Sequence, residues 1–252
     1  MKRNIWLWSI VFLFGLTSST YPFAMSLEQE PFINSLSPKM SDKGDFTIHI
    51  QHYFLESNVA SLAVRLGYVL ADDIEMYATG RYHATDTGDT KFVGREIDIL
   101  YLQSFLKEDQ ESWIDLSLEF GAGSRREKFT QEEVTLDTRN FFQAHLLTGR
   151  TFGNIFYAMV SPDLVYDAEA QESYTAVTGA LKLIIKGSVA LTAELSSLMN
   201  NPLDWEDPWS AGIQFHIGPH ILTLFVANTS GFTASQILQG TKNIYGGFRF
   251  AF

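Results

Sequence analysis

The chain ends in Asn243-Ile244-Tyr245-Gly246-Gly247-Phe248-Arg249-Phe250-Ala251-Phe252, and this stretch decides the fold. In an extended strand, alternate side chains point to opposite faces, so the three Phe share one face and Arg249 lies on the other. A buried edge strand of a soluble sandwich is one interpretation. The better one is the last strand of a membrane-spanning barrel, because that strand must present an apolar face to lipid and pair with the first strand.

The amino terminus has the pattern of an export signal. Lys2 and Arg3 precede an apolar run at residues 5–16, which is too short for a spanning helix of about twenty residues. We therefore predict a cleaved signal peptide at residues 1–24, a short polar lead-in at 25–43 and a barrel domain at 44–252. The chain has no Cys and no later apolar stretch of spanning length, so we expect a periplasmic, secreted or outer-membrane protein.

Segments that alternate between apolar and polar residues recur from residue 44 onward, as in strands rather than helices. Twelve are expected, at 45–54, 60–70, 74–84, 91–104, 112–123, 141–150, 154–162, 173–185, 187–196, 207–217, 220–229 and 243–252. The sequence therefore predicts an all-β fold, a single antiparallel up-and-down transmembrane β-barrel of about 12 strands. Alternation is weakest at 91–104 and 154–162, so the register of these two strands is left open.

The connections alternate in length. Short turns at 71–73, 151–153 and 218–219 alternate with longer polar segments at 85–90, 124–140, 163–172, 197–206 and 230–242, with residues 107–111 as an exception. Outer-membrane barrels have short periplasmic turns and longer extracellular loops, whereas a sandwich has no reason to sort its loops in this way. We therefore predict the bacterial outer membrane as the location and the lipid bilayer as a partner.

The terminal row of Phe248, Phe250 and Phe252 also resembles the signal by which the outer-membrane assembly machinery recognises barrel precursors. This resemblance makes the barrel-assembly machinery a second expected partner, reached through the C-terminal strand.

Ionisable side chains opposite the apolar rows are assigned to the lumen, because Arg or Lys facing lipid at the midplane costs about 2–4 kcal/mol. The predicted lumen-lining residues are His49, Arg65, Glu75, Arg81, His83, Asp98, Asp115, Glu119, His145, Lys182, Glu194, His216 and Arg249. Their four basic and five acidic side chains predict a nearly neutral interior. Two functions stay open: a channel for a small solute, and a structural barrel plugged by salt bridges.

Other functional classes have weaker support. The net charge of −11 disfavours nucleic-acid binding. A lipid-modifying enzyme with a rim site near His83 is an alternative, but the chain has no His-x-Ser motif and no catalytic residue is assigned. The six His are dispersed, so no metal site is predicted, and no cofactor fingerprint is present. A surface adhesion or partner-binding barrel, using the mixed charges of residues 124–140, is a further alternative.

Residues 201–230 resemble a family of membrane-bound β-barrel domains of unknown function, numbered 5777. The resemblance rests on Asp207-Pro208, Gly212, Gly218-Pro219-His220 and Asn228-Thr229, with Gly-Pro where the family pattern leads us to expect Gly-Gly. It covers the last quarter of the chain in detail and the rest by layout. It implies a membrane barrel and transfers no catalytic residue, since the family has no assigned chemistry.

Overall fold

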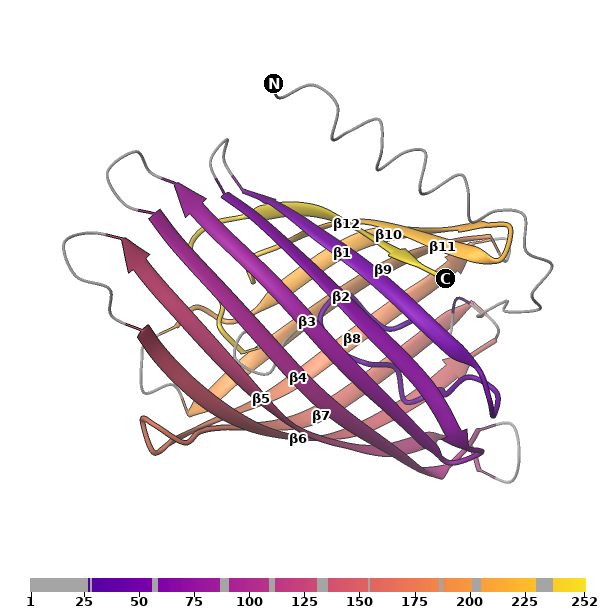
Figure 1. Ribbon diagram of the computed structural model, residues 1–252. Coiled ribbons are helices and arrows are strands. Elements are labelled where there is room, and N and C mark those ends of the chain that lie inside the picture. Colours follow the sequence, from indigo (N-terminus) through magenta and orange to yellow (C-terminus); the bar gives the residue numbers. More distant parts are fainter. Residues whose placement is uncertain are drawn as a thin grey trace.

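The last strand pairs with the first and closes the sheet into a barrel in this computed structural model (Figure 1). The register of this closure runs from His49 opposite Ala251 to Phe54 opposite Gly246. The structure describes residue 27 and residues 29–55, 59–86, 91–108, 112–130, 136–153, 155–185, 188–200, 205–229 and 238–252. The predicted signal peptide lies outside these residues. No helix in the described part of the chain is long and apolar enough to cross a membrane.

Each strand of the wall is antiparallel to its neighbours in the sequence. The strands are β1 (Phe46–Leu55), β2 (Val59–Ala71), β3 (Ile74–Asp86), β4 (Lys91–Leu106), β5 (Asp115–Thr130), β6 (Leu136–Phe152), β7 (Phe156–Asp167), β8 (Glu172–Ile185), β9 (Val189–Asn200), β10 (Trp209–Ile217), β11 (His220–Ala227) and β12 (Tyr245–Ala251). The prediction of an all-β, up-and-down barrel of about 12 strands is confirmed.

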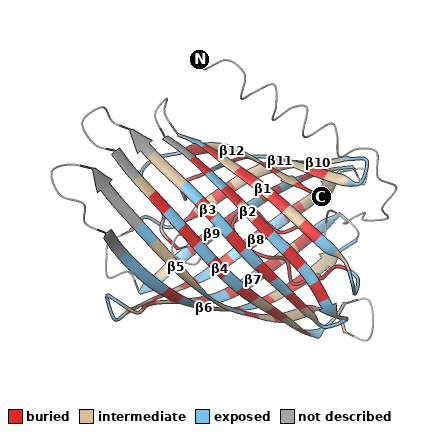
Figure 2. Ribbon diagram, viewed as in Figure 1, coloured by how far each residue is buried: buried red, intermediate tan, exposed pale blue. Residues whose placement is uncertain are grey.

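The wall has an apolar outer face and a buried inner face, because side chains alternate along each strand. Figure 2 shows buried and exposed positions following one another along the strands. On β4, Ile97 and Ile99 are 66% and 57% exposed, whereas Glu96 and Asp98 are buried. Isolated exposed apolar side chains are common in soluble proteins, but a continuous band of them around a barrel suits contact with hydrocarbon.

Two hairpins are longer than the sequence predicted. Residues 124–140 were expected to form a loop, but β5 and β6 continue into this segment, with Ser124 opposite Asn140. In the same way, β7 and β8 occupy most of the predicted loop at 163–172 and leave only residues 168–171 between them. The predicted boundaries are wrong here because backbone hydrogen bonds hold a β-ladder together, and apolar alternation is needed only where the strand meets hydrocarbon.

The two strands with weak alternation are irregular. The pairing of β4 with β5 has a register shift between Ser104 and Leu106. The pairing of β6 with β7 runs to His145 opposite Asp163 and continues from Thr148 opposite Val160. Pro162 lies in this interval, and it has no N–H to donate to the ladder.

The segment before β1 packs inside the barrel. We define residue 27 and residues 29–40 as the lumenal segment. Its apolar side chains join buried wall residues in three clusters. Phe32, Leu36 and Met40 pack with Val69, Tyr77, Leu100, Leu102, Leu147, Tyr157, Met159 and Ala180; Ile33 packs with Tyr53, Phe225, Ala227 and Tyr245; and Leu27 packs with Ala190, Ile221 and Ala251. Because these wall residues come from strands on all sides of the barrel, the segment fills its lumen.

Candidate functional site

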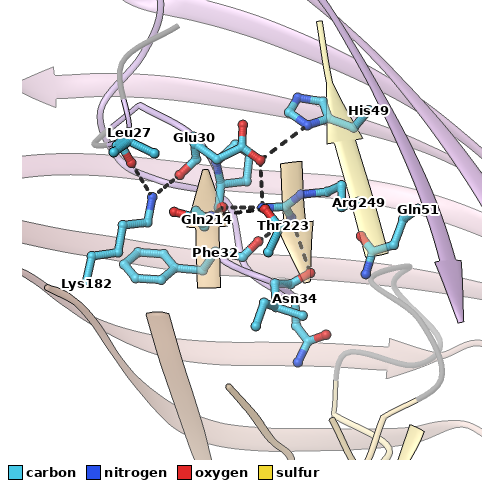
Figure 3. Close-up of polar contacts among 12 residues, drawn as sticks. Leu27, Glu30, Phe32, Asn34, His49, Gln51, Lys182, Gln214, Thr223 and Arg249 are labelled. Atoms are coloured by element: carbon cyan, nitrogen blue, oxygen red, sulfur yellow. Dashed lines mark hydrogen bonds and ion pairs between the residues drawn. The ribbon is translucent and has the colours of Figure 1, made fainter. Parts of the chain in front are cut away.

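Arg249 of β12 contacts both the backbone of the lumenal segment and the side chain of Glu30 within it (Figure 3). Its guanidinium donates to the carbonyl of Pro31 at 2.6 Å and to that of Phe32 at 2.5 Å. Nη2 also lies 2.7 Å from Oε1 of Glu30, and the two side chains are 4% and 0% exposed. Nδ1 of His49 lies 3.9 Å from the same carboxylate oxygen. A buried guanidinium is costly unless it is paired, so these contacts fix the segment at β12.

Lys182 of β8 is the second basic anchor. Its Nζ donates to the carbonyl of Leu27 at 2.8 Å and also to the carbonyl of Glu30. The ammonium lies 4.7 Å from the ring centroid of Phe32, within the range of a cation–π interaction. Lys182 is fully buried, and these contacts supply the partners that a buried ammonium needs.

Glu194 of β9 is the acidic anchor. Its carboxylate accepts from the backbone N–H of Asn34 at 2.9 Å and from the hydroxyl of Ser35 at 3.3 Å. The side-chain oxygen of Asn34 in turn accepts from the hydroxyl of Thr229 at 3.2 Å. The lumenal segment is therefore held by polar groups on β8, β9 and β12, in addition to its apolar contacts.

The segment returns along the opposite wall. The hydroxyl of Ser117 donates to the carbonyl of Pro38 at 3.1 Å, and Nζ of Lys39 lies 3.8 Å from Oε2 of Glu108. Gly149 makes room for the part of the lumenal segment around Pro38, because a Cβ at position 149 would lie 2.8 Å from Cγ of Pro38. The fit is close enough that one added methyl group would displace the segment or the wall.

A second polar cluster lies on β6 to β9. Nδ1 of His145 lies 2.7 Å from Oδ1 of Asp163, and that carboxylate also accepts from the hydroxyls of Ser161 and Thr178. The hydroxyls of Thr178 and Ser196 are 2.7 Å apart. Since Ser161 donates to the carboxylate rather than to the imidazole, these residues do not form a nucleophile–base pair.

The predicted rim site near His83 lies beside a small cavity. The residues that line it are Arg81, His83, Gly94, Arg95, Glu96 and Arg125. Arg81 donates to Ser61 at 2.9 Å, and its guanidinium lies 3.6 Å from Glu96 and 3.4 Å from Nδ1 of His83. None of the described residues lining this cavity carries a hydroxyl or a thiol. The cavity therefore offers basic side chains that can pair with an anion, and these residues supply no nucleophile.

Side chains from the loop regions cover part of the lumen at the end far from Leu27. Leu238, from the connection between β11 and β12, packs against Phe141, Val165, Tyr174 and Ala176. The ring of Trp205 stacks on Tyr174 with centroids 4.6 Å apart. The adhesion alternative rests on residues 124–140, and the side chains of residues 127–137 within this range lie outside the described ones.

The residues predicted to line the lumen fall into two groups. Those that the structure buries are His49, Arg65, Glu75, Arg81, Asp98, Asp115, Glu119, His145, Lys182, Glu194 and Arg249. His83 and His216 are half-buried. The structure brings Glu119 within 4.0 Å of His145 and links His49 to Arg249 through Glu30. Their role as a channel lining stays a prediction.

The structure also buries four acidic residues that the sequence analysis did not assign to the lumen. These are Glu30, Glu96, Asp163 and Asp167. Glu96 had a usable signal, because it lies two residues before Asp98 and therefore shares its face. Asp163 and Asp167 fell in a predicted loop. Glu30 had no signal, since its segment shows no periodic pattern and folds against the wall only in three dimensions.

The C-terminal Phe residues lie on the outer face. Phe248 stacks on His52 of β1 with ring centroids 5.8 Å apart, and Phe250 and Phe252 are 4.8 Å apart. Arg249 between them is buried, as the alternation requires. The function of this row as an assembly signal stays a prediction.

Comparisons with known proteins agree with this architecture. Residues 28–252 match the model of a family described as "Membrane bound beta barrel domain (DUF5777)". No curated protein matches the sequence. Among solved structures, the chain is similar to the KdgM porin in complex with disordered oligogalacturonate, with a TM-score of 0.54, 8% identity, and coverage of 82% of this chain and 98% of that one.

Two further structures have lower scores. The translocator domain of autotransporter NalP from Neisseria meningitidis has a TM-score of 0.48 at 12% identity, over 82% of this chain and 85% of that one. LpxR from Salmonella typhimurium has a TM-score of 0.45 at 10% identity, with coverage of 82% of this chain and 99% of that one. At such identities the likeness concerns the fold alone, that of a membrane β-barrel similar to bacterial outer-membrane proteins.

Proposed function

The chain belongs to the DUF5777 family of membrane-bound β-barrel domains, and from this premise we propose that it is an outer-membrane pore for small solutes that its own lumenal segment holds closed. The observation that carries the proposal is the anchoring of the lumenal segment by Arg249, Lys182 and Glu194. A segment that enters the lumen from outside the sheet can leave it again without breaking any strand pairing. A barrel filled only by wall side chains has no such route to an open state.

The location is part of the same proposal. The protein is exported with cleavage of residues 1–24 and inserted in the outer membrane of a Gram-negative bacterium by the barrel-assembly machinery. The outer face supports this, because large apolar side chains such as Ile97, Leu195 and Phe142 are 66%, 60% and 52% exposed. The short turns then face the periplasm, and the lumenal segment enters from that side, since Leu27 packs against Ile221 and Ala251 near the β10–β11 turn.

Conductance of the refolded protein in a planar bilayer tests the proposal. The wild type is expected to stay closed for most of the recording. Phe32→Ala is expected to open more often, because a fully buried Phe side chain contributes about 1.5–3 kcal/mol and its loss weakens the closed state. Phe142→Ala is the matched control, since this Phe is 52% exposed on the outer face.

The alternative is a structural barrel whose interior never opens. If neither the wild type nor Phe32→Ala conducts while both are folded, the structural barrel replaces the pore. If Phe142→Ala opens the barrel as often as Phe32→Ala does, the closure does not depend on the lumenal segment.

A further inference from the structure

The carboxylate of Glu30 occupies a basic position in an otherwise uncharged part of the inner wall. Among the described residues of β10, β11, β12 and β1, Arg249 is the single charged side chain that is buried. The polar neighbours on these strands carry no carboxylate, ammonium or guanidinium group, and they include His49, Gln51, Gln214 and Thr223 (Figure 3). Lys182 on β8 adds a second positive charge within electrostatic reach of Glu30.

The carboxylate contact is separate from the contacts that hold the backbone. Arg249 already donates to the carbonyls of Pro31 and Phe32, and Lys182 donates to that of Leu27. Arg249 therefore binds the main chain of the segment and, separately, the negative charge of Glu30, which lies 2.7 Å from its guanidinium. Glu194, the acidic anchor, does not take this role while the segment is docked, because its oxygens accept from Asn34 and Ser35.

We propose that Arg249, Lys182 and His49 form a carboxylate-binding site in the lumen, which Glu30 fills in the docked segment and in which a small monocarboxylate can take the place of the Glu30 side chain. The inference adds a binding site to the proposed pore and says nothing of the ions that carry its current, since binding itself requires no conduction. Without the Glu30 carboxylate, the buried guanidinium of Arg249 keeps its carbonyl acceptors and loses its ion pair. Since an uncompensated buried charge is strongly unfavourable, the site recruits another carboxylate.

Chemical rescue tests the site in the full-length protein. Glu30→Ala removes a CH₂ and a carboxylate, and these are nearly the atoms of acetate. The chain has no Cys, so Ser35→Cys provides one thiol in the lumenal segment, where Ser35 is 8% exposed. The rate at which a water-soluble maleimide labels this thiol in lipid vesicles then measures how often the segment leaves the lumen.

Glu30→Ala is expected to raise the labelling rate about tenfold or more, because a broken buried pair costs well over the 1.4 kcal/mol that corresponds to a factor of ten. Sodium acetate is expected to return the rate most of the way to that of the parent protein. Acetamide, which has the same shape but no charge, and sodium chloride at equal ionic strength are expected to leave it unchanged. Glu30→Gln keeps the space filled, so its rate should not respond to acetate.

The guanidinium is tested by adding Arg249→Gln to Glu30→Ala, which should abolish the effect of acetate. The proposal is overturned if acetamide acts as well as acetate, or if acetate still acts in the Arg249→Gln background. If Glu30→Ala alone does not refold, the yield of folded protein is compared between refolding in acetate and refolding in acetamide. A higher yield in acetate supports the site, and equal yields overturn it. Acetate rescue without any conductance would keep this site and reject the pore, whereas conductance without rescue would do the reverse.

Discussion

Arg249, on the strand that closes the barrel, and Glu30, in the segment before the first strand, form an ion pair with a nitrogen–oxygen distance of 2.7 Å. The two ends of the domain are thus joined twice, by the pairing of β12 with β1 and by this contact inside the lumen. The segment cannot reach its final position until β12 is in place, because β12 supplies the guanidinium. Filling of the lumen is therefore coupled to closure of the barrel.

The first prediction concerns this pair. Arg249→Gln leaves Glu30 buried without its partner, and breaking a buried pair costs about 3–5 kcal/mol. We expect the barrel to stay folded and the lumenal segment to leave the lumen at least about 100-fold more often. Maleimide labelling of a Ser35→Cys reporter measures this exposure.

Arg126→Gln is the matched control for that change, because Arg126 is exposed on β5 and loses the same charge. Equal labelling rates in the two variants would show that the pair does not hold the segment. Replacing Glu30 and Arg249 together by Met should restore part of the docking, since an apolar pair leaves no buried charge.

The second prediction concerns assembly. Phe252→Ala removes the last aromatic residue from the outer face of the C-terminal strand, where its ring lies 4.8 Å from that of Phe250. We expect less folded protein in the outer-membrane fraction, measured as the heat-modifiable band on a gel. Phe152→Ala, at a 49% exposed position outside the C-terminal strand, should reduce it far less. A similar loss in both would assign the effect to lipid contact rather than to the terminal signal.

The third prediction concerns orientation. An epitope tag inserted at residues 131–135, between β5 and β6, should be accessible to antibody on intact cells. A tag between Asp72 and Asp73, in the turn that joins β2 and β3, should become accessible only after the outer membrane is opened. The reverse pattern would invert the barrel and place the entry of the lumenal segment on the cell surface.

The fourth prediction concerns ion selectivity in the open state. The buried charges are more acidic than the sequence analysis expected. Glu30 leaves the lumen with its segment in the open state. Among the described residues of the wall, the buried acids are Glu75, Glu96, Asp98, Asp115, Glu119, Asp163, Asp167 and Glu194, and the buried bases are Arg65, Arg81, Lys182 and Arg249. The sequence analysis predicted a nearly neutral interior, whereas these residues carry an excess of acidic groups. We therefore expect a preference for cations, measured as a reversal potential in a salt gradient across Phe32→Ala channels.

Arg81→Ala should strengthen that preference, because it leaves Glu96 without the guanidinium that lies 3.6 Å away. The shift should shrink as salt rises, since the screening length falls to about 3 Å at 1 M. Arg126→Ala, on the outer face, should leave the reversal potential unchanged. An anion preference in Phe32→Ala would contradict the inward placement of these acids.

The sequence predicted which face of the wall a side chain occupies wherever apolar and polar residues alternate regularly along a strand. Phe248, Phe250 and Phe252 must face away from Arg249, whatever the rest of the chain does, because the period of a strand is two. The same rule identified Lys182 and Glu194 as candidates for the inner face. It was less informative where alternation ended, so β5 and β6 extend beyond their predicted limits, and the charged partner of Arg81 proved to be Glu96.

By itself, the sequence determined a closed antiparallel barrel with an apolar outside, since strand period and turn chemistry are local properties. Only the tertiary structure decided what occupies the inside. Residues 27–40 have no periodicity, and the partners of Glu30, Asn34 and Pro38 lie on β12, β9 and β5, far away in the chain. A segment whose conformation is fixed by contacts with a completed wall carries no local pattern of its own, so its place in the lumen follows from packing alone.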